Sequence, residues 1–184
     1  SSQPRIIARG SSQPHIEARG SSQPRIEARG YVQLSVWGKV IAKVSSEVGV
    51  FIHGELAQVT GGRQTRIKLK TSKEWCEYYG VEIKKGVAIL FKAVDEDFST
   101  SNARPKGIFY KPGDKPVAPD WDGGRAECGG GLHASCYPTA ALHFNSAAKK
   151  FIALPVHLTD FKPFPNAQYP DNVKFQTVAG PVWE

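Results

Sequence analysis

The sequence predicts a mainly β protein, in which an N-terminal β-solenoid of about ten-residue repeats precedes a small α+β domain. Two observations lead to this prediction. A decapeptide close to SSQPRIEARG occurs three times at the start of the chain, and each copy alternates apolar and polar residues. The rest of the chain mixes short apolar runs with helix signals. We therefore expect two domains, residues 1–70 and residues 71–184.

Each repeat is typical of one strand with a single buried face. Ile26 and Ala28 share one parity, whereas Glu27 and Arg29 share the other, and this period of two is that of a strand. The SSQP segment favours a corner, because proline cannot donate a ladder hydrogen bond and serine hydroxyls bond to nearby backbone. The predicted solenoid core is Ile6, Ala8, Ile16, Ala18, Ile26, Ala28 and Val36.

The same phase continues beyond the three clear copies, with Val40, Val48 and Val50, so the segments that follow resemble diverged repeats. The segment RIKLK at 66–70 alternates again. One short strand cannot bury its apolar side alone, but stacked copies can, and a fixed repeat period is the signature of a solenoid. Ten residues are short for a coil with two corners. We therefore expect two repeats per coil, one in each sheet.

The positive charge lies in the repeat half of the chain. Residues 1–70 contain 11 Lys and Arg against 4 Asp and Glu, whereas residues 71–184 contain 13 of each kind. Outward-facing side chains of stacked strands form columns, and the predicted basic ladder is Arg9, Arg19, Arg29 and Lys39. This ladder is either a solvated face that prevents edge association or a stripe that binds nucleic acid or another acidic polymer.

Several classes of protein are disfavoured. No run approaches the length of a membrane span, so we expect no membrane partner. Three cysteines do not make a disulfide scaffold, which favours a reducing compartment. The chain has no methionine and begins in mid-repeat, so we expect upstream sequence, and an N-terminal targeting signal stays open. The expected location is cytoplasmic or virion-associated.

The second half carries its own element signals. Thr71 and Glu74 form a capping box for a helix that Gly80 ends. Residues 84–86 form the turn of a hairpin whose second strand is apolar. Further strands are expected over 107–111, around Leu132, over 149–158 and over 173–184, with a helix over 138–144. This mixture is typical of a compact α+β domain.

Nitrogen and sulfur ligands are densest over residues 128–143, at Cys128, His133, Cys136 and His143. Their spacing, Cys-x4-His-x2-Cys-x6-His, does not match zinc fingers or knuckles, so we expect no metal there. Cys136 and His133 as a nucleophile pair would lack a third, orienting group. The DWDGG segment at 120–124 is better explained by turn formation than by calcium binding, because it lacks the regular oxygen spacing of a calcium loop.

The motifs EWCEYYGVEI, VAILFKAVDEDF, YKPGD, APDWDGG and ECGGGLH, within residues 74–144, resemble a domain of actinobacterial and actinobacteriophage proteins. In that family, degenerate SSQPRIEARG repeats and YVQLSV precede a GGGLH-type domain of unknown function. The resemblance covers most of the chain. It implies a two-part architecture and a phage or actinobacterial source, and it implies no activity.

A second resemblance concerns chemistry. The segment GGGLHAS, followed by TAALHF, is similar to the glycine–aromatic strand and small-residue helix of ADP-ribosyltransferases, which use NAD. This resemblance implies that His133 stacks on nicotinamide and that Lys92 stands where the family usually has Arg or His. Lysine cannot form the bidentate contacts of arginine. Glu184 is the carboxylate that could act as the catalytic acid residue.

Three functional hypotheses follow. The first is a structural or interaction protein without a cofactor, in which the solenoid stem self-associates or attaches to another protein and displays the head. The second is an ADP-ribosyltransferase-like enzyme or effector head, or an inactive NAD-like pocket, on a solenoid spacer. The third is a basic solenoid that binds nucleic acid. The first is preferred, because the sequence contains no complete catalytic set.

Overall fold

The computed structural model describes residues 5–10, 15–17, 25–30, 32–37, 39–53, 55–100, 108–124, 126–164 and 169–184. These residues form thirteen strands and two short helices, so the protein is mainly β, as the sequence predicts. They divide into two compact units. Unit 1 comprises residues 1–68 and 165–169, and unit 2 comprises residues 69–164 and 170–184.

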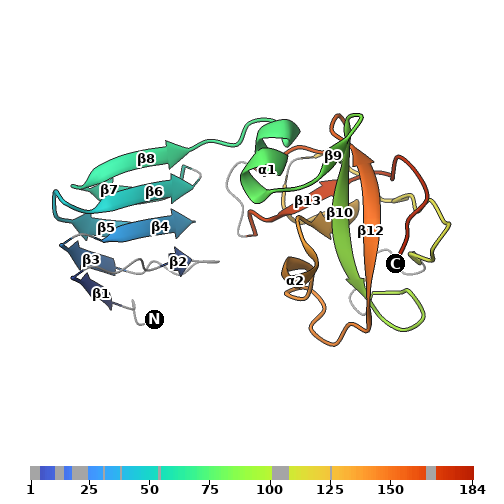
Figure 1. Cartoon of the computed structure of the whole chain (residues 1–184), viewed down its shortest axis with the longest axis horizontal. Coiled ribbons are helices and arrows are strands. Elements are labelled where there is room, and N and C mark those ends of the chain that lie inside the picture. Colours follow the sequence, from blue (N-terminus) through green and yellow to red (C-terminus); the bar gives the residue numbers. More distant parts are fainter. Residues whose placement is uncertain are drawn as a thin grey trace. The chain divides into compact units, whose positions relative to one another are not determined.

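Unit 1 contains two parallel sheets, and successive strands alternate between them (Figure 1). The first sheet has the order β1-β3-β5-β7 and the second has the order β2-β4-β6-β8. The strands of the first sheet are β1 (Arg5–Arg9), β3 (Arg25–Arg29), β5 (Ile41–Val44) and β7 (Gln58–Thr60). Those of the second are β2 (His15–Glu17), β4 (Gln33–Trp37), β6 (Gly49–His53) and β8 (Arg63–Ile67).

The register follows the repeat. Ile6 of β1 lies opposite Ile26 of β3, a shift of twenty residues, so a strand pairs with the strand two repeats further on. From β3 to β5 the shift falls to sixteen, with Arg25 opposite Ile41. The physical reason is in the sequence, since the segments after residue 30 lack the SSQP corner.

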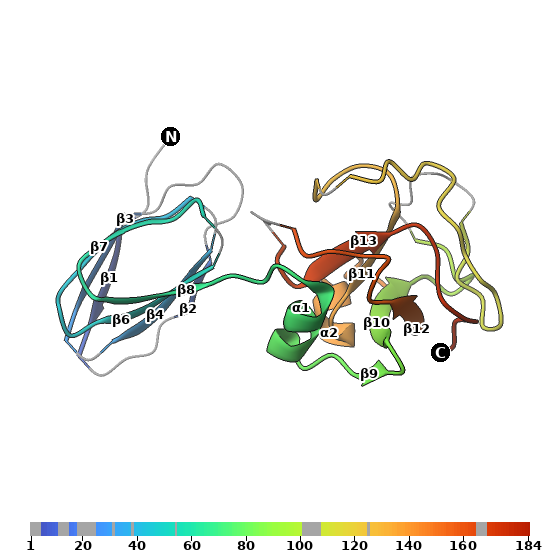
Figure 2. The same ribbon diagram turned by 90° about the horizontal axis from the view of Figure 1, so that it is seen from above.

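The apolar core of unit 1 comes from the inward faces of both sheets. Figure 2 shows the strands of one sheet opposite those of the other. Ile6 of the end strand β1 is partly buried against this cluster, and the side chains of Ala8, Ile16 and Ala18 lie outside the described part. The buried members are Ile26, Ala28, Val32, Leu34, Val36, Val40, Ala42, Val44, Val48, Val50, Ile52 and Ala57.

Unit 2 begins with helix α1 (Ser72–Tyr79), and the predicted capping box is confirmed. The Thr71 side chain accepts a hydrogen bond from the Glu74 backbone N–H, and the Glu74 carboxylate accepts one from the Thr71 N–H. Gly80 ends the helix in the left-handed conformation, with φ of 66°. Both features satisfy backbone groups that a helix end leaves unpaired.

One antiparallel sheet forms the centre of unit 2. Its order is β12-β10-β11-β13, and β9 pairs with β10 at one end. The predicted hairpin is confirmed, because β9 and β10 are joined by Lys85 and Gly86, both with positive φ as a two-residue hairpin turn requires. The bounds are β9 (Ile83–Lys84), β10 (Val87–Val94), β11 (Leu132–Ser135), β12 (Lys150–His157) and β13 (Asn172–Phe175), with helix α2 (Pro138–Ala141).

Several predicted elements have different bounds. The helix expected over 138–144 ends at Ala141, and its N-cap residue Tyr137 makes no side-chain cap bond. The strand expected over 173–184 ends at Phe175, after which Thr177 and Trp183 each form an isolated β-bridge. The described residues 108–111 of the segment expected as a strand over 107–111 form none. The strand expected over 66–70 begins earlier, as β8.

Candidate functional site

His133 lies on the opposite face of β11 from the core. Its neighbours Leu132 and Ala134 belong to the main apolar cluster of unit 2, and side chains alternate along a strand. On the outer face, His133 lies opposite Lys174 of β13. Lys174 is buried. The face of β11 and β13 that points away from the core therefore carries polar side chains and is itself covered.

The glycine loop before β11 packs against the DWDGG loop. A Cβ atom at Gly131 would lie 2.8 Å from the Trp121 ring, and one at Gly129 would lie 2.6 Å from an Asp122 carboxylate oxygen. At such distances the neighbouring side chain must shift, and both glycines also have φ values that other residues rarely adopt, so these two positions favour glycine. The GGGLH and DWDGG motifs are therefore two halves of one packing arrangement.

An ion pair holds this arrangement together. The Lys174 Nζ lies 2.8 and 3.0 Å from the two Asp122 carboxylate oxygens and 5.7 Å from the Trp121 ring centre. The hydrogen bond from Lys174 lowers the pKa of Asp122, and a backbone N–H bond from Gly124 adds to this. A buried ammonium without a partner is costly, and the Asp122 carboxylate supplies a partner for Lys174.

Lys92 lies on the core face of β10, between the fully buried Leu90 and Val94. Strands β10 and β11 pair at Phe91 and Ser135, and the described ladder does not extend to His133. The Lys92 Nζ instead donates to the His133 carbonyl oxygen at 2.8 Å and lies 5.0 Å from the Tyr110 ring centre. Burial lowers the pKa of Lys92 to about 8.

The His133 ring is held in a defined orientation. Its Nε2 lies 3.2 Å from the Glu127 carbonyl oxygen, which can only accept, so Nε2 carries the hydrogen and a neutral ring keeps Nδ1 as an acceptor. Burial lowers the pKa of His133, and the nearby Lys92 charge lowers it further. The ring is therefore neutral at neutral pH.

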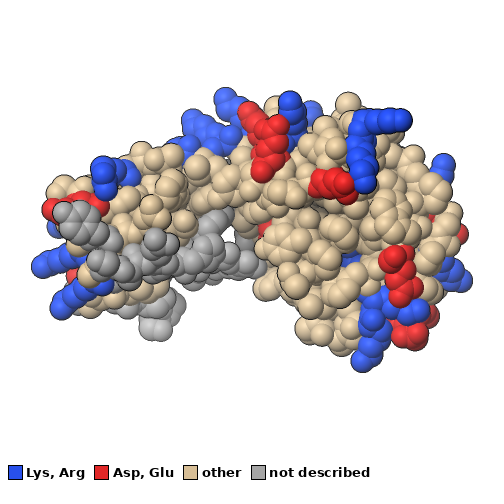
Figure 3. Space-filling view, viewed as in Figure 1, with Lys and Arg blue, Asp and Glu red and all other residues tan. Residues whose placement is uncertain are grey.

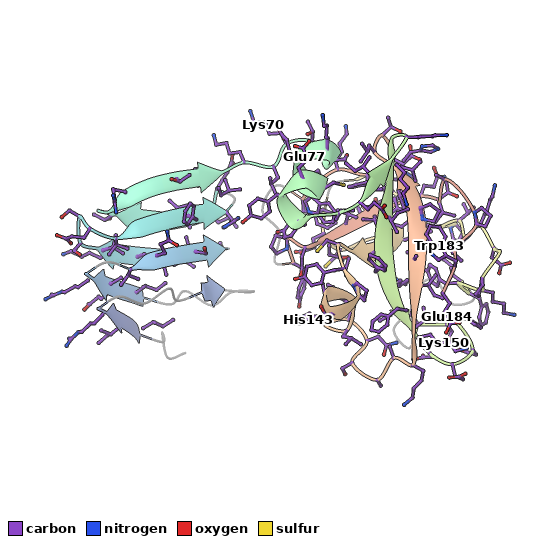
Figure 4. All side chains as sticks on the ribbon, viewed as in Figure 1. Lys70, Glu77, His143, Lys150, Trp183 and Glu184 are labelled. Atoms are coloured by element: carbon purple, nitrogen blue, oxygen red, sulfur yellow. The ribbon has the colours of Figure 1, made fainter. Side chains whose placement is uncertain are left out.

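The structure does not join Lys92, His133 and Glu184 into one catalytic set. Lys92 contacts the backbone of His133 rather than its ring. Glu184 is remote in the sheet: Trp183 bridges to Ala153 on the outer edge of β12, two strands away from β11. Figure 4 shows Trp183 and Glu184 beside β12.

The four nitrogen- and sulfur-bearing residues of 128–143 that the sequence analysis considered do not converge. Cys136 is part of the apolar core, and burial raises the pKa of its thiol to about 12. Cys128 is exposed, and the exposed His143 makes an edge contact with Phe144 after α2. Within the described residues, no three His, Cys, Asp or Glu side chains group as metal ligands.

The predicted basic ladder divides between two places. Arg9 and Arg29 are exposed Cα partners in the first sheet, and Figure 3 shows Lys and Arg side chains at this end of β1 and β3. Lys39 is exposed in a bend after β4, outside the strands, and Arg19 lies outside the described residues. The column beside the arginines contains Ile7, Glu27 and Lys43.

The last strand of unit 1, β8, has a feature that the sequence analysis did not predict. Gln64 and Arg66 occupy the register positions of the buried Val50 and Ile52, so the inward column of β8 is polar. The Gln64 side-chain amide donates to the carbonyl oxygens of Val59 and Gly61. The available signal was the break in apolar parity at residues 64 and 66.

A glycine turn closes the same end. A Cβ at Gly61 would lie 2.2 Å from the Val44 carbonyl oxygen, and one at Gly62 would lie 2.8 Å from the Val48 carbonyl oxygen. Both residues have positive φ, so the turn can pass close to the backbone of Val44 and Val48. Together with Gln64, this turn covers the end of the apolar stack.

Comparisons with protein-family models, with curated proteins and with solved structures found no match for this chain. Within the described part of the chain, neither helix has the length or apolar character needed to cross a membrane. The function proposed below therefore rests on the side chains and contacts of this chain alone.

Proposed function

We propose that unit 1 is a β-solenoid stem with two repeats per coil, and that the protein is a structural or interaction protein. The stem mediates assembly or attachment, and unit 2 is the small α+β head that it displays. The alternating strand order, the parallel in-register pairing and the continuous inward column support a solenoid. The resemblance to actinobacterial and actinobacteriophage proteins supports a virion-associated or cytoplasmic role.

The difference between the two ends of unit 1 carries this proposal. At the β7–β8 end, the Gly61–Gly62 turn and the Gln64 amide cover the stack. At the other end, Ile6 of β1 is partly buried, as is Val59 of β7, whereas Ile26 on the strand next to β1 is fully buried. A covered end blocks further stacking, and an end strand with an accessible apolar column favours it.

The end strands also favour pairing with chains of similar sequence. Parallel strands pair through backbone groups, and RIIAR already lies in register on RIEAR. A coil with the same alternation would bury Ile6 as Ile26 is buried. The expected neighbour at this end is therefore another coil of this kind, whether from sequence upstream of residue 1, from a second copy or from another repeat protein.

The test compares two single substitutions on β1. Ile6→Lys places a charge on the inward column and should abolish assembly, measured by size-exclusion chromatography with light scattering and by electron microscopy. Ile7→Lys changes an exposed, outward residue of the same strand and should leave assembly intact. A wild-type chain that stays a compact monomer and adheres to no repeat protein would contradict the proposal, as would assembly that survives Ile6→Lys.

A basic stem that binds an acidic polymer is a second candidate. The exposed Arg9 and Arg29 support it, because adjacent strands place them about 4.8 Å apart. Glu27 in the neighbouring column reduces the local positive potential. Binding to single- or double-stranded nucleic acid should weaken steeply with salt and weaken further in Arg9→Ala/Arg29→Ala. Retention that does not change with salt would count against it.

An NAD-dependent head has weaker support. Trp121 and Asp122 occupy the space beside the glycines, where a dinucleotide would need to approach, and Glu184 is two strands from His133. Labelled NAD tests this alternative, with His133→Ala as the comparison. Binding or transfer that depends on His133 would favour it, and no binding at millimolar NAD would exclude it.

A further inference from the structure

A loop packs over the outer face of β13 in unit 2, where Lys174 lies. We call residues 120–124 and 126–131 of this loop the flap. A Cβ atom at Gly129 of the flap would be 3.4 Å from the Lys174 Nζ. The Trp121 ring, also in the flap, has its centre 5.7 Å from the same atom. The flap therefore contributes to the burial of Lys174, which is 2% exposed.

Three contacts of titratable side chains hold the flap in place. The Lys174 Nζ donates to both carboxylate oxygens of Asp122. The His133 Nε2 donates to the carbonyl oxygen of Glu127 at 3.2 Å. The Asp120 carboxylate accepts a backbone N–H from the other end of the flap, also at 3.2 Å. The first two contacts join the flap to the sheet, and the third joins its two ends.

The charges around the flap depend strongly on pH. The titratable groups in the flap or against it are Asp120, Asp122, Glu127 and Cys128 of the flap, His133 of β11, Lys174 of β13, Lys92 of β10, and Tyr110. Acid neutralises the carboxylates among them and gives the His133 ring a charge, whereas both ammonium groups keep theirs. The charge of this region therefore becomes strongly positive in acid.

We propose that the flap is an acid-sensitive switch, which opens when Asp122 and His133 take up protons. A protonated Asp122 no longer offers a carboxylate to Lys174, and a buried ammonium that has lost its partner needs water. A protonated His133 places a second positive charge directly across the strands from Lys174, and like charges at such positions are destabilising. Opening admits water to both groups and exposes the polar face of β11 and β13.

The directions of two pKa shifts set the pH range of the opening. Burial lowers the pKa of His133 below its ordinary value of 6.5, and the nearby Lys92 charge adds to this. The hydrogen bond from Lys174 lowers the pKa of Asp122 below its ordinary value of 3.8. In both cases the open flap binds protons more readily than the closed one. Closure is therefore fully favoured above pH 6.5, weakens as His133 titrates, and is lost as Asp122 titrates below pH 3.8.

The opening should be confined to the flap. The main apolar cluster of unit 2 lies on the other face of the sheet, and of the described flap residues only Trp121 packs against it, as a partly buried side chain. Strands β10 and β12 pair along their whole length, from Val87 to Val94 of β10. Neither feature depends on the charge of Asp122 or His133. The sheet should therefore stay folded at pH values where the flap opens.

Acrylamide quenching of tryptophan fluorescence in the full chain, followed from pH 7 to pH 3, tests this switch. Subtracting the signal of Trp121→Phe isolates the contribution of Trp121, which should become more accessible once the pH falls below 6.5. Amide hydrogen exchange in β10 and β12 should stay slow at the same pH values. Exchange that accelerates throughout unit 2 together with the exposure of Trp121 would overturn the proposal, because acid would then unfold the whole head.

Asp122→Asn should open the flap at neutral pH, because it removes the carboxylate without changing the size of the side chain. At pH 7.5, acetic anhydride should then label Lys174 roughly tenfold to hundredfold faster than in the wild type. Labelling of the exposed Lys84 serves as the internal reference. Asp114→Asn changes an exposed aspartate outside the flap and should leave Lys174 protected. Equal labelling of Lys174 in the wild type and in Asp122→Asn would refute the switch.

His133→Gln provides an independent test if Asp122→Asn is too unstable to label. Glutamine keeps a donor for the Glu127 carbonyl oxygen but cannot gain a charge, so Trp121 should stay shielded to a lower pH than in the wild type. A quenching curve with an unchanged midpoint would contradict the proposal. These measurements concern unit 2 alone, so their outcome does not depend on assembly through unit 1.

Discussion

Gly131 and Trp121 illustrate how single residues determine the packing of the head. Gly131 has φ of +126° and would place a Cβ 2.8 Å from the Trp121 ring. The glycine motif that resembles a nucleotide-binding strand in sequence is thus explained by a contact within the chain. The sequence resemblance singles out residues 129–131, and the structure identifies the side chains that pack against them.

Gly131→Ala should destabilise unit 2 by about 2–4 kcal/mol, because it combines left-handed backbone strain with a clash against the Trp121 ring. Gly113→Ala is the control. Gly113 has φ of +96°, and no atom of the described residues lies within 4 Å of the position that a methyl group would take there, so this change should cost only about 1 kcal/mol of strain. Urea denaturation measures both. Equal losses would show that the contact with Trp121 does not matter.

The buried amine of Lys92 should give a pH-dependent stability. Its pKa is about 8 in the folded chain against an ordinary value of 10.5, so between these two values the unfolded chain binds more protons than the folded one. Stability therefore rises with pH across this interval, by on the order of 1–3 kcal/mol. The free energy of unfolding of the wild type minus that of Lys92→Met should show this rise. A difference that is constant from pH 7 to pH 11 would contradict the lowered pKa.

At the scale of elements, the sequence best predicts those helices and turns whose determining residues lie close together in the chain. Thr71, Glu74 and Gly80 define α1 because both ends of the helix are satisfied within the segment itself. The Lys85–Gly86 turn fixes its hairpin for the same reason. Helix α2 and strand β13 are shorter than predicted. After β13 the chain makes a contact distant in sequence, in which the Ala179 N–H donates to the Pro155 carbonyl oxygen.

The hydrogen bonds of Gln64 at the β7–β8 end of unit 1 should contribute measurably to stability. Gln64→Ala removes two hydrogen bonds to the carbonyl oxygens of Val59 and Gly61 and should cost about 1–2 kcal/mol. Amide hydrogen exchange in β7 and β8 should accelerate accordingly. Gln58→Ala, at an exposed position of β7, is the control and should leave exchange unchanged. Equal protection in both variants would mean that Gln64 does not hold the turn.

For the molecule as a whole, the repeat pattern of unit 1 predicts far more of the structure than the sequence of unit 2 does. Parity indicates which residues of β3 and β4 face inward, and Ile26, Ala28 and Val36 are buried. The candidate site could not be predicted in the same way. Its contacts join residues 92, 121–122, 129–133 and 174, which no periodic pattern relates. Residue chemistry suggested Lys92 and His133, but not that they would face opposite sides of the sheet.

The proposed β-solenoid has two repeats in each coil. Arg9 then lies beside Arg29, whereas a coil of one repeat would place Arg9 beside Arg19. Neighbouring parallel strands lie about 4.8 Å apart, which is within disulfide range. Oxidative cross-linking of double-cysteine variants, made with the exposed Cys128 changed to Ser, distinguishes the two arrangements directly.

The account predicts that Arg9→Cys/Arg29→Cys forms an intramolecular disulfide, seen as a shift of the monomer band on a non-reducing gel and confirmed by peptide mass spectrometry. It predicts that Arg9→Cys/Arg19→Cys does not. A disulfide between residues 9 and 19, with none between residues 9 and 29, would contradict the two-repeat coil.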